Sequence, residues 1–179
     1  MDEGAGTTVA DASGNGHDGT IKGTLDWVNG APDFGKGLDF PATAGNYVNC
    51  GTFDPSGGDN ILTVSAWFKV EATTSTYQCI VGKAVETASG AVQWQLTLTS
   101  TLQLGFNLGA GFATISDALT AGEWHHAAMT LNGSDGELFV DGVSVGTRTG
   151  LGLNAARVDD PIMIGVVGSL TFTNCNPSI

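Results

Sequence analysis

The chain has 179 residues, 27 of them glycine, with 13% charged residues and a formal net charge of −12 at pH 7. This length fits one domain with a substantial core. Only six Lys plus Arg are present, so the basic surface that nucleic acid or an anionic membrane requires is excluded. No apolar run of about eighteen residues predicts membrane insertion, and residues 1–20 show no signal peptide.

The first unusual segment is "DASGNGHDG" at 11–19, which is rich in glycine and in oxygen-bearing side chains. Glycine, Asn and Asp tolerate positive φ and fold back onto the backbone, so the segment is typical of a plain turn. The same residues offer the carboxylate, amide and carbonyl oxygens that Ca²⁺ takes as ligands. Both interpretations remain open at this level.

Short apolar or alternating runs, bounded by Gly, Asn, Asp and Ser, recur along the chain, and helical periodicity is nearly absent. The clearest predicted strands are 61–70, 77–84, 92–100, 102–109, 124–132, 136–142 and 143–150. We therefore predict an all-β fold, a two-sheet antiparallel β-sandwich of the jelly-roll type. No composition shift or linker divides it, so 1–179 is expected to be a single domain, and we expect it to be a module of a longer protein.

Alternation along 61–70 predicts two different strand faces. The small and branched side chains expected to face the other sheet are Val64, Ala66, Phe68 and Val70. The opposite row holds Ser65, Trp67 and Lys69. On that outer face Trp67 either packs under a loop or lines a groove, and packing is the commoner role of a lone tryptophan.

The turns "NGSDG" at 132–136 and "DG" at 141–142 stand between alternating segments. They predict hairpin loops with glycine at positive φ, and hence a three-stranded antiparallel meander over 124–150.

The three cysteines Cys50, Cys79 and Cys175 are widely spaced and match neither a zinc site nor a redox CxxC motif. Buried free thiols are favoured, with a Cys50–Cys79 bridge as the alternative.

Eight segments in order, "DEGAGTTVADASGNGHDGTI", "GKGLDF", "NYVNCG", "LTVSAWFKV", "QCIVGK", "GEWHHAAMTLNG", "ELFVDG" and "IMIG", carry a family likeness. The chain resembles, from residue 2 to about 165, the laminin-G-like jelly-roll domains of the concanavalin A-like lectin/glucanase superfamily. The resemblance implies two curved antiparallel sheets stacked face to face, commonly with bound calcium and a glycan- or protein-binding role. It also fits a secreted or surface-exposed location, as does the acidic composition.

The resemblance implies that the first turn contributes to a calcium site. The matching ligands are Asp11 and Asn15, while Gly14 and Gly16 permit the bend. Asp18 is a further candidate ligand. His17 is a poor calcium ligand and is expected to cap the turn or face solvent.

Asp159 and Asp160 could approach the same end of the sandwich, although a solvated loop is the simpler interpretation. The chain departs from its family at both ends. The tail offers "SLTFT" (169–173), which we predict to add to its own sheet as a short final strand, with pairing to a neighbouring chain as the alternative.

Catalysis is disfavoured because a retaining glycosidase needs two carboxylates on one strand face, and the E-x-D-x-E pattern of hydrolases in this superfamily is missing. The nearest pair, Glu137 and Asp141, has no acid between its members, and Asp141 is interpreted as a turn residue. Glu123 precedes His125 and His126, but adjacent strand residues point to opposite faces. We therefore predict no enzyme.

The sequence favours a non-catalytic, carbohydrate-binding module. Sugars are recognised by aromatic faces together with amide and carboxylate groups. The candidate ligand-binding residues are Trp67, Trp94 and Trp124, with Gln93, Gln95 and Asn107 as polar neighbours. The alternative is an adhesion or structural module of a surface or virion protein that binds another protein. A tryptophan exposed in a concave groove with polar neighbours would favour the glycan.

Overall fold

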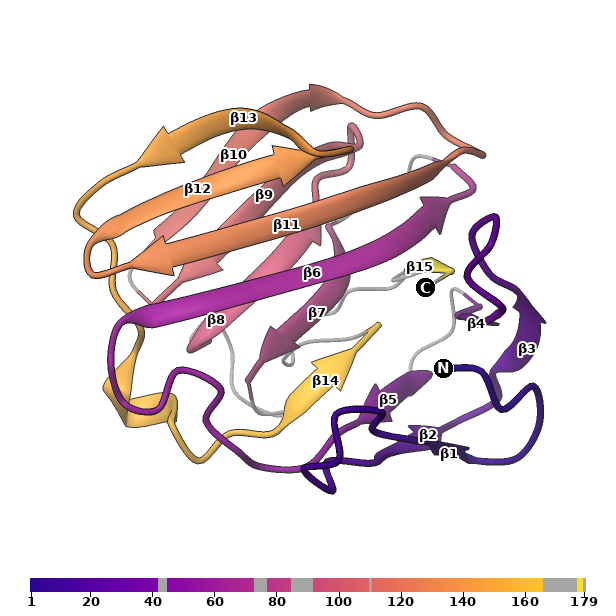
Figure 1. The fold of residues 1–179 in the computed structure, drawn as a ribbon. Helices are drawn as coiled ribbons and strands as arrows, with labels where there is room; N and C mark the ends of the chain where they lie inside the picture. Colours follow the sequence, from indigo (N-terminus) through magenta and orange to yellow (C-terminus); the bar gives the residue numbers. More distant parts are fainter. Residues whose placement is uncertain (42–44, 73–76, 85–91, 110, 166–176, 179) are drawn as a thin grey trace.

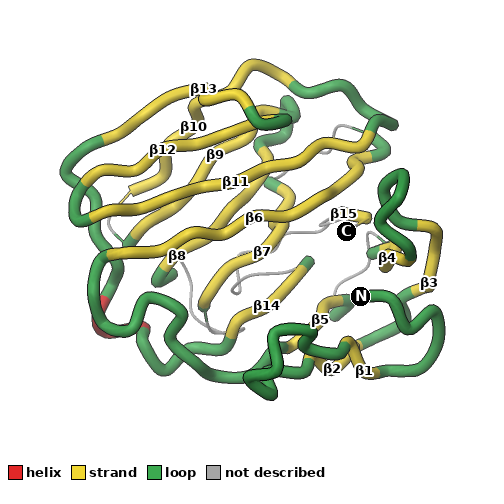
Figure 2. Tube along the Cα trace, in the orientation of Figure 1, coloured by secondary structure: helices red, strands yellow, loops and turns green. Residues whose placement is uncertain are grey.

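The computed structural model describes residues 1–41, 45–72, 77–84, 92–109, 111–165 and 177–178. These residues form strands, loops and one short 3-10 turn, Ala155–Arg157, in the connection from β13 to β14 (Figure 2). Among them, no helix has the length and apolarity required to cross a membrane.

The larger sheet has eight strands in the order β1-β2-β5-β14-β7-β8-β9-β10, and all neighbours are antiparallel. In chain order these are β1 (Thr8–Val9), β2 (Gly19–Lys22), β5 (Tyr47–Asn49), β7 (Gln78–Lys83), β8 (Trp94–Leu98), β9 (Gln103–Leu108), β10 (Gly111–Ala118) and β14 (Ile162–Ile164).

The smaller sheet has five antiparallel strands in the order β13-β12-β11-β6-β15. Their bounds are β6 (Ile61–Val70), β11 (Trp124–Asn132), β12 (Asp135–Val140), β13 (Val143–Arg148) and β15 (Pro177–Ser178). A separate hairpin joins β3 (Asp26–Asn29) to β4 (Lys36–Asp39). The two main sheets lie face to face as a sandwich, which confirms the predicted fold class (Figure 1).

The centre of the smaller sheet follows directly from the sequence pattern. Strands β6 and β11 have the predicted bounds and pair along their length, from Trp124 opposite Lys69 to Asn132 opposite Ile61. The β12–β13 turn has φ of 50° at Asp141 and 80° at Gly142. Two successive positive φ values suit the tight hairpin turn that matches the twist of antiparallel strands. The predicted meander over 124–150 is confirmed.

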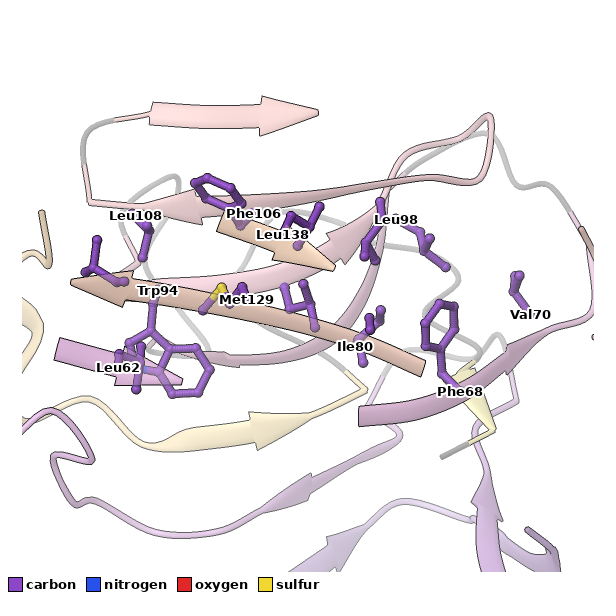
Figure 3. Close-up of a cluster of buried hydrophobic side chains, with 14 of the residues drawn as sticks. Leu62, Phe68, Val70, Ile80, Trp94, Leu98, Phe106, Leu108, Met129 and Leu138 are labelled. Atoms are coloured by element: carbon purple, nitrogen blue, oxygen red, sulfur yellow. The ribbon is translucent and has the colours of Figure 1, made fainter. Parts of the chain in front are cut away.

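The main core fills the space between the sheets, as Figure 3 shows. On β6, Phe68 and Val70 are fully buried, while Val64 and Ala66 are partly buried and pack against the same cluster. The predicted inward row is thus confirmed. A second, smaller cluster around Val9, Leu38, Phe40 and Val48 lies beneath the N-terminal strands.

Some features differ from the predictions or lie beyond them. Strand β10 was not among the predicted strands. Cys50 is a half-buried free thiol, so the alternative Cys50–Cys79 bridge is not formed, and Cys79 is buried. The predicted strand 169–173 and Cys175 lie outside the described residues, whereas Pro177 of β15 pairs with Val70 of β6.

Candidate functional site

A groove of about 360 Å³ lies beside β6, where this strand faces the β3–β4 hairpin and the N-terminal residues. Trp67 and Ser65 line it from the outer row of β6, and Val64 and Ala66 line it from the inner row. Because both rows of one strand contribute, the groove lies along the side of β6 that faces away from β11, next to the residues Lys69 and Val70 that pair with β15.

Trp67 is the central aromatic side chain of this groove. It is half-buried, and its cross-strand partner on β11 is His126. The rings of Trp67 and His126 have centroids 5.2 Å apart, and the Phe34 ring lies 5.1 Å from Trp67 on another side. The side chain of Phe34, from the turn between β3 and β4, is 57% exposed. The three rings form a tilted aromatic strip that reaches solvent.

Polar groups border the aromatic strip. The Lys36 backbone N–H donates to the Asp2 carboxylate at 2.9 Å, and the Lys36 ammonium donates to the Asn29 side chain at 2.9 Å. Asp2, Lys36 and His126 line the groove together with the exposed Ser65. An aromatic face with hydrogen-bonding groups at its border can hold a ligand that has both C–H faces and hydroxyls.

Trp124 shares the outer face of the small sheet with Trp67 but is not among the groove residues. It is half-buried, and the Lys69 ammonium lies 6.0 Å from its ring centroid. Lys69 also pairs with Glu71 at 2.8 Å. Trp67 and Trp124 therefore lie on the same sheet face, but Trp67 lines the groove and Trp124 lies beside Lys69 outside it.

Trp94 occupies a different position from the one predicted. Its side chain is 2% exposed and belongs to the main core (Figure 3). The reason is that Trp94 shares a face of β8 with Leu96 and Leu98, and this row packs into the main core. Gln93 and Gln95 are buried as well, and Asn107 is half-buried. The expectation that Trp94 offers its ring to a ligand at the surface is corrected.

The turn at 11–18 is held by its own side chains. The Asp11 carboxylate accepts the N–H groups of Ser13 at 2.8 Å and His17 at 3.0 Å. The Asp18 carboxylate accepts the Asp11 N–H at 2.8 Å, and the Asn15 amide donates to the Ser13 hydroxyl. Hydrogen bonds from the Ser13 side chain and from the His17 and Ser13 backbone lower the pKa of Asp11 to about 2.

This network shows how the turn can fold without an added ion, while the carboxylates keep further lone pairs. The described residues contain no group of three or more His, Cys, Asp or Glu side chains that could hold a metal. Calcium at Asp11, Asn15 and Asp18 therefore stays a prediction. His17 stacks on Phe53 with ring centroids 3.7 Å apart, so it is packed rather than free in solvent.

Asp160 departs from the expected solvated loop, since it is 6% exposed. Its backbone carbonyl accepts a hydrogen bond from the Lys83 ammonium, which also donates to the Phe53 carbonyl at 2.7 Å. Lys83 is fully buried, and burial lowers its pKa while Asp54, Asp160 and Asp159 oppose that shift. No local sequence pattern predicts this contact, because the three segments come together only in the folded chain.

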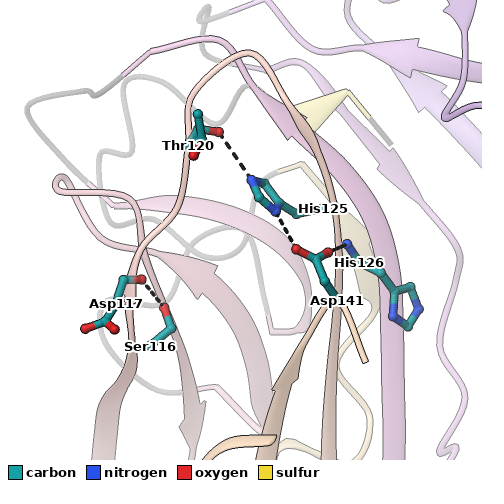
Figure 4. Close-up of polar contacts among 6 residues, drawn as sticks. All are labelled: Ser116, Asp117, Thr120, His125, His126 and Asp141. Atoms are coloured by element: carbon teal, nitrogen blue, oxygen red, sulfur yellow. Dashed lines mark hydrogen bonds and ion pairs between the residues drawn. The ribbon is translucent and has the colours of Figure 1, made fainter. Parts of the chain in front are cut away.

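Figure 4 shows a second polar arrangement that sequence reasoning missed. His125 points inward, and its Nδ1 lies 2.8 Å from the Asp141 carboxylate while Nε2 lies 3.3 Å from the Thr120 carbonyl. The other Asp141 oxygen accepts the His126 N–H at 2.8 Å. Burial raises the pKa of Asp141, but hydrogen bonds from His125 and the His126 backbone outweigh it and hold the pKa below its usual value. Asp141 is thus a turn residue whose carboxylate also links the β12–β13 turn to β11 by hydrogen bonds.

Residues 42–173 match the family model described as the concanavalin A-like lectin/glucanases superfamily. No curated protein sequence matches the chain. Among solved structures, a mutant of Trypanosoma rangeli sialidase displaying trans-sialidase activity is similar, with a TM-score of 0.71 and 16% identity. The alignment covers 99% of this chain and 27% of the sialidase.

Two smaller domains are also similar. Domain 4 of AbnA, an extracellular arabinanase from Geobacillus stearothermophilus, solved in complex with arabinotriose, has a TM-score of 0.65 and 19% identity over 89% of this chain and 79% of that domain. The binding domain of Paraclostridial Mosquitocidal Protein 1 has a TM-score of 0.65 and 16% identity over 93% of this chain and 43% of that one. At these identities the similarity shows the fold.

Proposed function

Because this chain belongs to the concanavalin A-like lectin/glucanases superfamily, we propose that it is a non-catalytic carbohydrate-binding module that holds glycans in the groove beside β6. The observation that carries this proposal is the position of Trp67. It lies in a concave groove with polar neighbours, which is the arrangement expected of a glycan site rather than of a purely packed tryptophan.

The geometry of the strip favours stacking on one side of a sugar. Phe34 and Trp67 have centroids 5.1 Å apart with planes tilted by 38°, which leaves no room for a ring between them. A sugar would instead lie across the strip with its C–H face on Trp67 and Phe34. Asp2, Ser65 and His126 would then supply hydrogen bonds to its hydroxyls.

The known structures supply independent support. The AbnA domain is of comparable length, since 79% of it is covered, and its solved structure is a complex with arabinotriose. The chain spans only about a quarter of the sialidase, so that enzyme's activity does not bear on this domain. Because the arabinanase is extracellular, we also propose a secreted or surface-exposed location for this chain.

A glycan array followed by calorimetric titration tests the proposal. Wild type is expected to bind at least one neutral glycan, and Trp67→Ala should weaken that binding by about tenfold or more, equal to about 1.4 kcal/mol. Trp124→Ala is the matched control, because it removes the same residue type from the same sheet face outside the groove. Equal losses in both variants would contradict the groove assignment.

The alternative is an adhesion or structural module that binds another protein. The exposed Phe34 is the feature that favours it, because an aromatic at the border of a groove also anchors protein partners. An array without any bound glycan, combined with loss of a protein partner in Phe34→Ala, would establish this alternative.

We further propose that the domain has no hydrolase activity. Glu137 accepts a hydrogen bond from the Ser144 hydroxyl, and Asp141 is held by His125 and the His126 backbone. Both carboxylates are thus occupied by structural contacts. Turnover of a glycan that disappears in Glu137→Gln or Glu123→Gln would contradict this proposal.

Calcium at the first turn is the last element of the proposal, with Asp11, Asn15 and Asp18 as ligands. The low pKa of Asp11 keeps its carboxylate charged at all ordinary pH values. A ligand of the folded state stabilises it by roughly 2.7 kcal/mol at a hundredfold excess over Kd. Added Ca²⁺ should therefore raise the melting temperature of wild type and leave Asp11→Ala unchanged. If the melting temperature of wild type changes with neither Ca²⁺ nor a chelator, the segment is a turn that binds no calcium.

A further inference from the structure

A second, smaller cavity of about 190 Å³ lies at the end of the sandwich where β6 begins. The segment before β6 contributes Asp54, Ser56 and Asn60, and the segment after β13 contributes Leu153 and Val158. The two walls are joined by a hydrogen bond from the Leu153 N–H to the Asn60 side chain at 3.2 Å. The cavity is therefore part of the ordered connection between the two loops.

Gln93 lines this cavity with a buried acceptor oxygen that is not hydrogen-bonded. Its side chain is 2% exposed, and its Oε1 has no hydrogen-bond partner. Its backbone is fixed, because its N–H donates to the Lys83 carbonyl at 2.9 Å. A buried acceptor without a donor is costly, and such groups in native proteins are usually met by a ligand or water.

The chemistry around Gln93 defines what could meet it. Asp54 Oδ1 accepts from Ser56 and Oδ2 accepts the Gly58 N–H at 3.2 Å, so the carboxylate is fixed with lone pairs to spare. Burial raises the pKa of Asp54, but the hydrogen bonds from Ser56 and Gly58 and the charge of Lys83 outweigh it and lower the pKa. The cavity thus offers acceptors and a negative charge, which disfavour an anionic ligand.

The same surroundings disfavour a metal ion. The Lys83 ammonium is held by the carbonyls of Phe53 and Asp160, and its charge acts on Asp54. The positive charge of Lys83 thus already offsets part of the negative charge of Asp54. A hydroxyl group fits better, since it can donate to the amide oxygen of Gln93 and can also accept from the amide nitrogen if the amide turns over.

We propose that this cavity is a second binding site, separate from the groove at Trp67, for a small neutral polyol such as a single sugar unit. Gln93 and Asp54 accept its hydroxyls, and Leu153 and Val158 cover its C–H groups. The volume of about 190 Å³ far exceeds the roughly 10–15 Å³ that one water molecule needs, so the cavity has room for a larger ligand. The proposal does not depend on glycan binding in the groove.

The test is an NMR titration that follows the side-chain amide resonances of Gln93 and the backbone amide resonances of Asn60 and Leu153, which line the same cavity and still report on binding when Gln93 is replaced. Glucose, galactose, mannose and arabinose are added separately to the wild-type chain, and Ca²⁺ is added in a parallel series. At least one sugar is expected to shift the Gln93 amide in a saturable manner, with Kd on the order of 1 mM because few hydrogen bonds are formed.

Two leucine variants make the result specific. Gln93→Leu should abolish sugar binding at this cavity without lowering the melting temperature, because it removes an unpaired buried oxygen. Gln95→Leu is the matched control, being a buried glutamine two positions along the chain that does not line the cavity, and it should retain the sugar-induced shifts of the Gln93 amide. In Trp67→Ala, which empties only the groove, the Gln93 shift should persist.

Three results would overturn the proposal. The first is that none of the four sugars shifts the Gln93 amide. The second is that binding survives in Gln93→Leu. The third is that Ca²⁺ alone produces the saturable shift, which would make the cavity a cation site. A wild-type chain in which sugars shift the Gln93 amide but no resonance of the groove residues would refute the proposed function and leave this one standing.

Discussion

Trp67 and Trp94 lie in different layers of the sandwich, and their surroundings differ accordingly. Trp67 stands in the outward row of β6 and lines the groove, whereas Trp94 stands in the row of β8 that packs into the main core. Both strands alternate in sequence, but Trp94 has the polar chain neighbours Gln93 and Gln95, whereas Trp67 lies between Ala66 and Phe68. The comparison shows that the strand face on which an aromatic lies, rather than the polarity of its chain neighbours, decides whether it is core or binding surface.

The different environments of the two tryptophans are tested most strongly by removing each side chain in turn and measuring the loss of stability. Trp94→Ala should lower the free energy of unfolding by about 3–5 kcal/mol, because it leaves a cavity in the main core. Trp67→Ala should cost about 1 kcal/mol, since its ring is only half-buried. Urea denaturation of both variants measures the difference, and similar losses would contradict the assigned environments.

Two lysines allow the same comparison between a buried and an exposed position. Lys83 is buried and pairs with Trp94 across β7 and β8. Lys83→Met removes the ammonium that donates to the carbonyls of Phe53 and Asp160, and should cost about 2–3 kcal/mol. Lys69→Met on the outer face loses a half-exposed ion pair with Glu71 and should change stability by less than about 1 kcal/mol. Thermal unfolding of the two variants provides the measurement, and a tolerant Lys83→Met would argue against a structural ammonium.

Removing the charge of Asp141 is expected to have a smaller effect on stability, and this effect should depend on pH. Asp141→Asn keeps the positive φ and the acceptor for His126 but loses the charge opposite His125, and should cost about 1–2 kcal/mol near pH 7. The folded-state pKa of Asp141 is lowered, so its stabilisation is present above the unfolded pKa of about 3.9 and is lost as pH falls through the folded value. The gap between wild type and variant should therefore shrink below about pH 4, and a constant gap down to strong acid would exclude the carboxylate as its source.

Trp124→Ala should have the smallest effect, below about 1 kcal/mol on unfolding. Its ring is half-buried beside Lys69 on the outer face and is not part of the groove. A loss as large as that of Trp94→Ala in the same denaturation series would show that the outer face is covered in the protein.

The sequence was informative where local pattern decides the structure. The bounds of β6 and β11, the turn at Asp141 and the inward position of Phe68 all follow from period-two alternation and turn chemistry. Strand β10 was missed because the run "GFATISDA" is made mostly of small and polar residues with little apolar contrast.

The site was only partly predictable. Trp67 could be placed on an outer face, but its ring partner Phe34 comes from a hairpin about thirty residues earlier, and no local pattern links the two. Trp94 was misjudged because alternation separates the two faces of a strand but does not show which face is turned toward the core, and both faces of β8 are buried. The unpaired oxygen of Gln93 likewise depends on loops that meet only in three dimensions.

The buried ammonium of Lys83 has a consequence for the conditions in which the domain stays folded. In many extracellular folds a dissolved ion joins neighbouring loops, and such a joint weakens when the ion is scarce. Here the positive charge between Phe53 and Asp160 is the ammonium of Lys83, which is a covalent part of the chain. This one contact between the two loops therefore needs no dissolved ion, because its positive charge is encoded in the sequence.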